Sequence, residues 1–409
     1  MNILLINHYA GSAKHGMEYR PYYLAREWVR LGHRVTIVAA SCSHVRVTKP
    51  RMTSSFTEED LDGVHYVWIK TPDYQGNGVR RVANMFAFVA QLLRYGTRLV
   101  RQCEPDAVIA SSTYPLDIYP ARHIARKAGA KLVFEVHDLW PLTPMELGGM
   151  SRWHPFIFLL QRGENYACRH ADRIVSILPK ADEHLRQHGM ADDKFVHVPN
   201  GVDVEQWQTG ATPLPPQHVQ ALTQLREDGR FIVGYAGGHG LSNALGAVVR
   251  AAERLQSLPV TIVLVGHGPE KEGLQKKVKQ LALTNVVFLP PVPKTAVGSL
   301  LAQMDILYIG WNRSPLYRFG ISPNKLLDYM MAAKPIVHAV EAGNDPVAEA
   351  GCGVCCRPEA AEEIADAVSE LMGRTPEERA AMGQRGRDYV MRHHQYPDLA
   401  QQFLDAVTR

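Results

Sequence analysis

The chain has 409 residues, of which 46% are hydrophobic, 21% charged and 8% aromatic. This composition is typical of a globular protein and excludes a disordered, fibrous or disulfide-stapled chain. At about 100 to 200 residues per domain, the length predicts two domains, each large enough to bury its own core.

Charge is unevenly distributed along the chain. The net charge is +4 overall, but residues 1–200 hold 25 Lys and Arg against 19 Asp and Glu, which leaves 20 against 22 for the remainder. The first half is therefore +6 and the second −2, so an anionic surface is expected to dock on the first half. No basic run is interleaved with aromatic residues, so no nucleic acid partner is expected.

The sequence predicts neither export nor a membrane span. The opening residues, MNILLINHYAG, have no basic region before the apolar segment and no cleavage site after it, so we predict no signal peptide. The most apolar stretches, 83–93 and 156–160, are far shorter than the about 20 residues that cross a bilayer. We expect a cytoplasmic protein that is at most peripheral on a membrane.

Two clusters have the residue types of metal ligands, but neither predicts a metal site. Cys352, Cys355 and Cys356 form one C-x-x-C-C cluster without a second Cys/His pair, so they supply at most three ligands. Asp60 and Asp62 match a D-x-D pattern, but they lie in an acidic run before a strand and are interpreted as a solvated loop. We therefore predict no metal.

The order of apolar segments predicts two doubly wound, Rossmann-like α/β domains. In the first half, apolar runs at 2–7, 35–40, 107–110, 132–136 and 173–177 alternate with amphipathic stretches, beginning with a helix at 20–31. The alternation restarts after a proline-rich stretch, with runs at 231–235, 260–265, 286–289, 306–309 and 335–338. We predict domains at 1–200 and 231–385, a connector at 201–230, and a C-terminal helix at 386–409 that crosses back to the first domain. The two sheets are expected to face a central cleft that binds a nucleotide-like ligand at their carboxyl edges.

The turn YAGGHGLSNALG, residues 235–246, follows a strand and precedes a helix. Its glycines allow the backbone to approach a ligand, Ser242 is expected as the helix N-cap, and free amides with the helix dipole suit a diphosphate. Gly266 and Gly268 repeat the pattern after the next strand. Tight strand–helix packing explains both turns equally well.

The segment FGISPNKLLDYMMAAKPIV, residues 319–337, predicts a helix that begins near Pro323. Lys325 lies in its first turn and Asp328 follows on the same face. An ammonium at a helix N-terminus neutralises phosphate, and a carboxylate one turn on accepts both hydroxyls of a ribose. An ordinary surface Lys–Asp pair is the alternative.

Two features of the first half are candidates for substrate contacts. His137 comes directly after the strand 132–136, where it can contact a sugar hydroxyl or act as acid or base, although most histidines are structural. The stretch 78–103 contains five arginines and no acid: Arg80, Arg81, Arg94, Arg98 and Arg101. As a helix it would carry four of them within about 60° of arc, opposite Met85, Phe88, Leu92 and Leu99. Such a helix suits an anionic membrane or a polyprenyl diphosphate, or it simply covers the sheet and leaves its arginines solvated.

Several motifs, taken in order, resemble the retaining, nucleotide-sugar-dependent glycosyltransferases of family 4, which have the GT-B fold. They are NHYAGS (7–12), GMEYRPYYLAREWVRLGHRVTIV (16–38), TPDYQGNGVRR (71–81), HDLWP (137–141), VPNGVD (198–203), YAGGHG (235–240), VGHGP (265–269) and ISPNKLLDYM (321–330). Within that family the chain is most similar to bacterial O-antigen and capsule transferases of the WbuB type, which are often described as L-fucosamine transferases.

The resemblance implies a metal-independent enzyme without a cofactor, in which a UDP-sugar is held mainly by the second domain. The acceptor, an undecaprenyl-diphosphate-linked saccharide at the cytoplasmic face of the inner membrane, is held by the first. Asp328 would take the ribose and Lys325 the diphosphate, while His137 would approach the donor sugar. The remaining donor contacts implied are Gly11, Ser12, Gly238, His239, Gly240, Asn243, Gly266, Gly268, Pro291, Val292, Arg318, Ser322 and Asn324, with the backbone of Pro291 and Val292 reading uracil.

The chain departs from the family pattern at two places. The family commonly has two glutamates eight positions apart, the second where Asp328 stands, but residues 313–327 contain no acid. Relatives also place a diphosphate-binding cation between positions 231 and 249, where this chain has none. Two other functions share the two-domain architecture: a non-hydrolysing UDP-sugar 2-epimerase, and a non-catalytic nucleotide-sugar-binding protein.

Overall fold

The computed structural model describes residues 1–76, 78–209 and 212–408. Residues 77, 210, 211 and 409, which fall in the TPDYQGNGVRR motif, the expected connector and the C-terminal helix, lie outside the described residues. The chain forms two compact units. The first comprises Met1–Asn200, Phe319–Ile321 and Tyr396–Arg409, and the second comprises Gly201–Arg318 and Ser322–Gln395.

The first unit is a mostly parallel sheet in the order β3-β4-β2-β1-β5-β6-β7-β8, in which only β3 and β4 pair antiparallel. Its strands are β1 Asn2–Ile6, β2 Arg34–Ala40, β3 Phe56–Leu61, β4 Val64–Ile69, β5 Ala107–Ala110, β6 Lys131–Val136, β7 Arg173–Ser176 and β8 Phe195–His197. Its helices are α1 Arg20–Arg30, α2 Val79–Cys103, α3 Ile118–Ala128, α4 Leu142–Glu146, α5 Pro155–His170, α6 Asp182–Gln187 and α16 Tyr396–Thr408.

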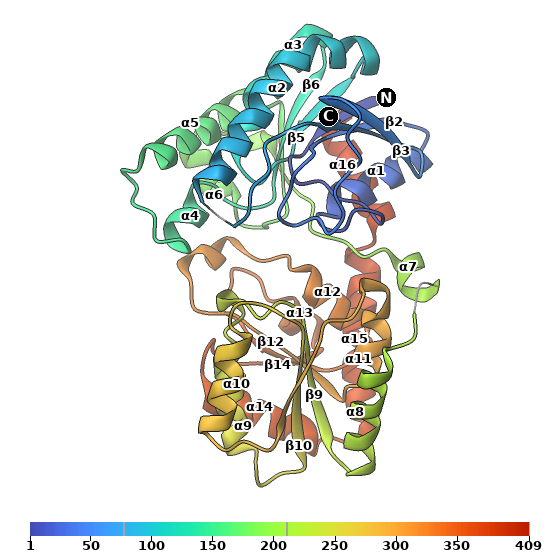
Figure 1. Cartoon of the computed structure of the whole chain (residues 1–409), viewed down its shortest axis with the longest axis vertical. Coiled ribbons are helices and arrows are strands. Elements are labelled where there is room, and N and C mark those ends of the chain that lie inside the picture. The colour runs from blue at the N-terminus through green and yellow to red at the C-terminus, as the bar shows by residue number, and fades with distance from the viewer. Residues whose placement is uncertain (77, 210–211, 409) are drawn as a thin grey trace. The chain divides into compact units, whose positions relative to one another are not determined.

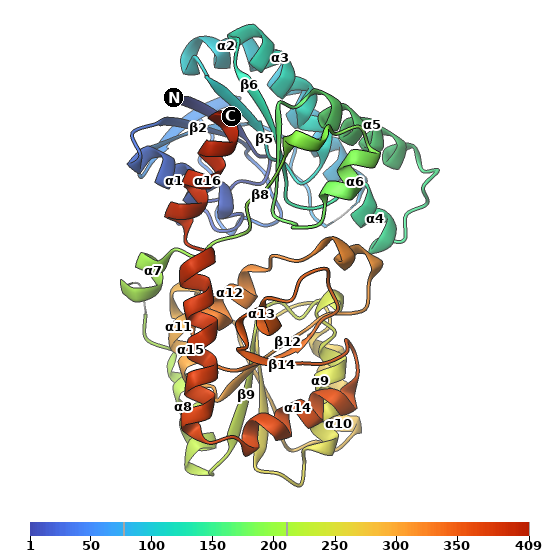
Figure 2. The same ribbon diagram turned by 180° about the vertical axis from the view of Figure 1, so that it is seen from behind.

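Helices cover both faces of this sheet, as the continuous apolar strands require. On one face, α1 and α16 lie side by side (Figure 2). Between them, Trp28 and Phe403 pack with their ring centroids 5.2 Å apart. On the other face lie α2, α3 and α5 (Figure 1). The Trp28 indole also donates a hydrogen bond to the carbonyl of Ala400. The C-terminal helix is therefore part of the core of the first unit.

The second unit is an all-parallel sheet in the order β11-β10-β9-β12-β13-β14. Its strands are β9 Phe231–Ala236, β10 Val260–Val265, β11 Val286–Leu289, β12 Ile306–Gly310, β13 Ile336–Ala339 and β14 Gly353–Cys355. Its helices are α7 Val204–Thr209, α8 Pro216–Glu227, α9 Leu245–Arg254, α10 Lys271–Gln280, α11 Val297–Ala302, α12 Asn324–Met331, α13 Pro346–Ala350, α14 Ala361–Gly373 and α15 Pro376–His393. One core lies under α9, α10 and α14, and a second, on the opposite face, lies under α8, α11, α12 and α15 (Figure 1).

Three expectations about local structure differ from the structure. Residues 201–230 are not a bare connector, because α7 and α8 belong to the second unit and Leu222 of α8 is buried in its core. Residues 386–395 likewise stay in the second unit as the end of α15, so only α16 belongs to the first. The acidic run is a loop only at Asp62, which lies in the turn after β3, whereas Asp60 lies in β3, whose pairing with β4 fixes an alternating exposed face.

Candidate active site

In the second unit, the strand order reverses between β9 and β12. The chain leaves β9 toward β10 on one side and leaves β12 toward β13 on the other. Ligands of open α/β sheets bind at the carboxyl ends of the strands at such a reversal, because the connecting turns diverge there. The turn after β9 and the N-terminus of α12 both lie at this point, since the Tyr329 hydroxyl on α12 bonds both the amide and the carbonyl of Ala236.

Lys325 is fixed at this position by two side chains of the β9 strand and turn. Its Nζ donates to the hydroxyl of Tyr235 at 2.7 Å and to Oδ1 of Asn243 at 2.9 Å, and it lies 4.3 Å from the centroid of the Tyr235 ring. Tyr235 and Asn243 in turn donate to the carbonyl of Gly238. Among the described residues no acid pairs with Lys325. Burial lowers the pKa of its ammonium to about 7.

Asp328 lies one turn along α12 and is half-buried. Burial raises the pKa of its carboxyl group to about 6, against a smaller opposing effect of Lys294. Its carboxylate accepts no hydrogen bond from the part of the chain that the structure describes. A half-buried acceptor with unused lone pairs is suited to a pair of ligand hydroxyls.

The N-termini of α9 and α12 both lack a side-chain cap. The sequence predicted Ser242 as the N-cap of α9, and this prediction is wrong. Ser242 lies in a 3₁₀ turn, Leu241–Asn243, and the N-cap is Ala244, in a left-handed conformation with φ of 46°. Pro323 is the N-cap of α12 and leaves the first amides of that helix without a side-chain acceptor. The free amides of the two helix ends can therefore bind an anion.

The glycines after β10 are explained by packing between turns. A Cβ on Gly266 would collide with the carbonyl oxygen of Gly237, and one on Gly268 would collide with the backbone of His239. His239 is fully buried, its amide donates to the carbonyl of His267, and burial lowers the pKa of its imidazole to about 4. Contacts of Gly266, Gly268 and His239 with the donor remain predictions. Gly238, in contrast, is exposed with open space around it.

The other residues predicted in this unit lie in segments that follow the carboxyl ends of its strands. Asn324 is exposed as the first residue of α12, and Ser322 is half-buried just before it. Arg318 is exposed in a 3₁₀ turn and donates to the carbonyl of Pro315. Pro291 and Val292 follow the carboxyl end of β11, the edge strand.

In the first unit, His137 follows β6 and is held by a buried carboxylate. Its Nε2 lies 3.1 Å from Oε2 of Glu135 and 2.9 Å from the hydroxyl of Ser111, and only 11% of its side chain is exposed. Because Nε2 faces the carboxylate, this nitrogen carries the proton and Nδ1 is the atom left for a ligand.

Glu135 is fully buried and contacts two side chains, Arg20 and His137. Arg20 Nε lies 2.9 Å from Glu135 Oε1, and the same guanidinium also donates to the carbonyls of Val198 and Pro199. Burial raises the pKa of Glu135, but the charges of His137 and Arg20 and two hydrogen bonds outweigh it and hold the pKa at about 2. His137 is thus anchored through Glu135 to α1 and to the end of the chain segment that follows β8.

Gly11 and Ser12, predicted to face the diphosphate, are buried and make local contacts. The Gly11 amide donates to the carbonyl of Glu18, and the Ser12 hydroxyl lies 2.9 Å from Nδ1 of His15 and accepts the amides of Lys14 and His15. Their part in donor binding remains a prediction.

Helix α2 carries the predicted arginines, and they differ in their surroundings. Met85, Phe88, Leu92 and Leu99 are buried, as expected. Arg81 is half-buried between the rings of Tyr9 and Trp140, and Arg98 pairs with Glu58 at 3.0 Å. Arg80, Arg94 and Arg101 are exposed, next to an apolar stripe of Val79, Phe86 and Leu93 that is 85%, 43% and 48% exposed. The sequence pattern did not predict this stripe.

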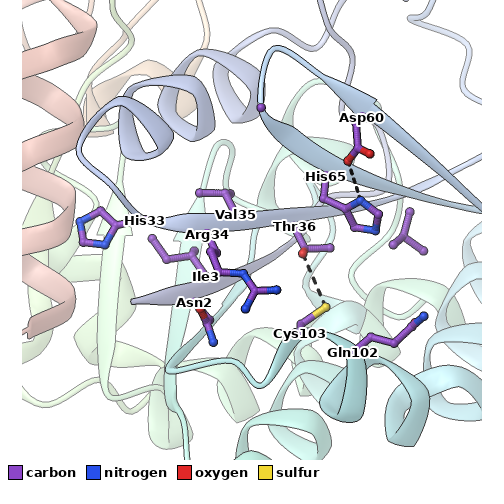
Figure 3. A pocket seen from close by; sticks show the side chains of 12 residues that line it. Asn2, Ile3, His33, Arg34, Val35, Thr36, Asp60, His65, Gln102 and Cys103 are labelled. Atoms are coloured by element: carbon purple, nitrogen blue, oxygen red, sulfur yellow. Dashed lines mark hydrogen bonds and ion pairs between the residues drawn. The ribbon is translucent and has the colours of Figure 1, made fainter.

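A pocket of about 460 Å³ lies at the amino edge of the first sheet, opposite the carboxyl edge that His137 follows (Figure 3). It is lined at the amino ends of β1 and β2 by Asn2 and Arg34, and internal hydrogen bonds join Asp60 to His65 and Cys103 to Thr36. Ligands of parallel sheets bind at the carboxyl edge, so this pocket is not the candidate active site.

Within residues 1–76, 78–209 and 212–408, no helix is long and apolar enough to span a membrane.

Sequence reasoning missed Tyr235, Glu135, Ser111 and Arg20. Glu135 had a signal, because an acid inside the apolar run LVFEV must find a buried partner. Tyr235 had none, since its partner Lys325 is 90 residues away along the chain.

Comparison with known proteins identifies the class of enzyme to which these two units belong. Residues 15–201 match the glycosyl transferase 4-like domain, and residues 230–374 match the glycosyl transferases group 1. The chain therefore belongs to the family 4 glycosyltransferases with the GT-B fold, and it is a glycosyltransferase that uses a nucleotide sugar.

One curated relative and several solved structures are similar over nearly the full length. The chain is 22% identical over 393 residues, 93% of each chain, to the Escherichia coli K12 protein named "Putative colanic acid biosynthesis glycosyl transferase WcaI". It also resembles Anabaena Alr3699/HepE in complex with UDP and glucose, at 16% identity, with 100% and 99% of the chains covered and a TM-score of 0.68. Sucrose-phosphate synthase of Thermosynechococcus elongatus is similar at 14% identity, with 98% and 97% covered and a TM-score of 0.74. The solved structures support the GT-B fold.

Proposed function

We propose that this chain transfers a sugar from a UDP-sugar, with retention of configuration and without a metal, to an undecaprenyl-diphosphate-linked saccharide. The sugar we propose is an N-acetylated amino sugar such as FucNAc or GlcNAc, and the process is the assembly of a bacterial surface polysaccharide. The observation that carries the proposal is Lys325, an ammonium held by Tyr235 and Asn243 at the carboxyl end of β9 without an acidic partner among the described residues.

The donor is proposed to bind with its diphosphate at Lys325 and the amides of the two helix N-termini. These groups are in position before the ligand arrives, so they can stabilise charge that develops on the departing UDP at little reorganisation cost. Asp328 would accept the ribose hydroxyls. The bond from the sugar's anomeric carbon to the β-phosphate oxygen breaks as the acceptor oxygen attacks from the same face, and the acceptor's proton passes to the departing phosphate.

His137 is proposed to contact the donor sugar through Nδ1. Glu135 holds Nε2–H on the far side of the ring, so the imidazole cannot rotate without losing a bond to a buried carboxylate. His137 is therefore oriented rather than free to exchange protons with Glu135, which stays ionised because its pKa is about 2.

The acceptor side is proposed to be peripheral on the cytoplasmic face of the inner membrane. Val79, Phe86 and Leu93 recur every seven residues on α2, and Arg80, Arg94 and Arg101 lie about 60° to 120° around the helix from the centre of this stripe. An apolar stripe beside a row of arginines is the pattern of a helix that lies in an anionic membrane interface. Trp153 and Phe158 are two further exposed aromatic residues of the same unit, each with an arginine near its ring.

The surface-polysaccharide role is supported by the relative named for colanic acid biosynthesis, and the amino sugar by the resemblance to transferases of the WbuB type. The test is to screen UDP, GDP and dTDP sugars by thermal shift, because a ligand that binds only the folded state raises its apparent stability. The best donor is then incubated, with EDTA present, with undecaprenyl-diphosphate-linked saccharides. The proposal expects a glycosylated lipid whose new anomeric centre, read by NMR, has the configuration of the donor.

Two other outcomes of that assay would replace the proposal. Epimerised UDP-sugar formed from UDP-GlcNAc without an acceptor would identify a 2-epimerase. Tight binding of a nucleotide sugar with no transfer to any lipid-linked acceptor would identify a non-catalytic binding protein.

A further inference from the structure

Three metal-ligating side chains meet in the first unit, on residues that the proposed transfer does not use. Glu164 is on α5, His184 is on α6, and His188 directly follows α6. One ligand atom from each lies within 4.8 Å of the others. Glu164 and His184 are buried, and 24% of the His188 side chain is exposed. We propose that Glu164, His184 and His188 bind one divalent transition-metal ion of the zinc type.

The donor atoms are spaced for a single small ion. His184 Nε2 lies 2.9 Å from Glu164 Oε1, a hydrogen bond whose proton leaves His184 when the ion binds, and His188 Nε2 lies 3.9 Å from Glu164 Oε2. Donors around a tetrahedral zinc ion, with bonds of about 2.0 to 2.2 Å, are roughly 3.4 Å apart. The two observed separations bracket that value. The four-residue spacing of the histidines places both rings on one side of α6.

Hydrogen bonds set the tautomer of His188 so that its lone pair faces the carboxylate. Its Nδ1 lies 2.8 Å from Oδ1 of Asn165, an oxygen that can only accept, so Nδ1 carries the proton. Gln161 Nε2 also lies 3.0 Å from this Nδ1, but its two hydrogens are directed to Glu164 Oε2 and Asn165 Oδ1 at 2.7 and 2.9 Å.

This arrangement leaves the Nε2 lone pair of His188 facing Oε2 of Glu164, an oxygen that has a second lone pair beside the one that accepts from Gln161. A cation between these two acceptors would bind both. Histidines that bind metals typically donate the proton of their other nitrogen to an oxygen, as His188 does to Asn165.

The donor set selects the class of ion. Two imidazoles and one carboxylate suit zinc, cobalt or nickel, whereas magnesium and calcium prefer oxygen ligands. A second group, His338, Asp345 and Cys355, also brings ligand atoms together. It is less suited, because Oδ1 of Asp345 already accepts the amides of Val347 and Ala348 as the N-cap of α13.

A bound ion would join α5 to α6 and also affect a neighbouring segment of the fold. The ring of His184 packs edge-on against Phe319 at 5.5 Å, and the Lys180 amide donates to the carbonyl of Phe319. Phe319 lies five residues before Asn324, the first residue of α12, which is the helix of Lys325 and Asp328. The site is thus structural in kind, and it is compatible with transfer that needs no metal at the donor.

The test uses the full-length protein after treatment with a chelator. Co²⁺ is titrated and followed by its visible absorption, and Zn²⁺ by competition with a chromophoric chelator. We expect one equivalent to bind. His188→Gln and Glu164→Gln should weaken binding at least about 100-fold, since loss of a mere supporting partner already costs about 10- to 100-fold. Asn165→Leu should weaken it within that smaller range.

His123→Gln is the matched control, because His123 is exposed on α3 of the same unit. Far-UV circular dichroism and the thermal midpoint of each variant establish folding, and the half-exposed His188 makes His188→Gln the variant most certain to fold. No saturable binding by the folded wild type, or equal affinity in His188→Gln and His123→Gln, would overturn the proposal. Because the readout needs neither UDP nor acceptor, it is independent of the proposed transfer.

Discussion

Lys325 Nζ lies 2.7 Å from the hydroxyl oxygen of Tyr235, and the two residues are 90 positions apart in the chain. The ring of the same tyrosine lies beneath the ammonium, 4.3 Å from its centroid. An aromatic face and a hydroxyl oxygen both stabilise a cation without neutralising it. The charge is therefore positioned for an anion that is still to bind.

Replacing Tyr235 by Phe should weaken UDP binding without unfolding the protein. The variant keeps the ring and its contribution to the core but removes the oxygen that orients Lys325. Hydrogen bonds to charged groups contribute about 1.5 to 3 kcal/mol, so we expect the Kd of UDP, measured by calorimetry, to rise at least about tenfold. Tyr389→Phe, which removes a surface hydrogen bond to Glu349 in the same unit, should leave the Kd unchanged. Equal Kd values in both variants would show that Tyr235 does not position Lys325.

UDP affinity should be greatest between about pH 6 and pH 7. Burial lowers the pKa of Lys325 to about 7, so above that pH the free protein loses the ammonium that binds phosphate. Burial raises the pKa of Asp328 to about 6, so below that pH the ribose acceptor becomes protonated. On each side the affinity should fall by up to about tenfold per pH unit.

Calorimetric titration of UDP from pH 5 to pH 9 measures this profile. Asp328→Asn should flatten the acid limb and Lys325→Met the alkaline limb. A flat profile in the wild type would contradict the assignment of both groups.

Glu135→Gln should destabilise the first unit. The substitution leaves the guanidinium of Arg20 buried without its counter-charge, which typically costs about 3 to 5 kcal/mol. The pKa of Glu135 is depressed from 4.5 to about 2, so its contribution to the free energy of unfolding is present above about pH 4.5 and is lost as the pH falls toward 2.

Urea unfolding at pH 7 and at pH 3 checks both statements for Glu135. The difference between wild type and Glu135→Gln should be smaller at pH 3. Glu183→Gln, an exposed carboxylate on α6, is the control and should unfold like the wild type. An undiminished difference at pH 3 would show that the ionised carboxylate is not the source of the stability.

The apolar stripe of α2 should bind anionic vesicles. Burying a Phe or Leu side chain contributes about 1.5 to 3 kcal/mol, so Phe86→Ser and Leu93→Ser should each weaken co-sedimentation with phosphatidylglycerol vesicles by about tenfold or more. Val219→Ser removes a similarly exposed side chain from α8 of the second unit and should have no effect. Vesicle binding that is unaffected by all three substitutions would place the membrane contact elsewhere.

The alternation of strands and helices was predictable because parallel strands buried on both faces have continuous apolar sequences. The helix at Asn324–Met331, with Lys325 in its first turn, was predictable for the same local reason, since capping and helical periodicity are short-range. The acidic strand β3 was not, because an edge strand alternates in exposure and resembles a polar loop.

Long-range pairings and close packing lay beyond the sequence patterns. Arg20 and Glu135 are 115 positions apart, and the sequence around either residue does not indicate that the other is its partner. Gly266 and Gly268 resemble a phosphate-binding turn in sequence, but a neighbouring turn comes so close to them that packing alone explains their identity. Gly320, eight positions before Asp328, has a φ of 99°, a conformation that disfavours a glutamate.

The most direct test of the account is the turnover of Lys325→Ala with the donor identified by screening. Loss of one charged donor that stabilises a leaving group costs about 100-fold or more in kcat, so we expect a decrease of at least about 100-fold. Lys276→Ala, which removes an exposed lysine from α10, should keep wild-type turnover. A Lys325→Ala enzyme with turnover close to that of the wild type would contradict the central claim that this ammonium holds the diphosphate of the donor.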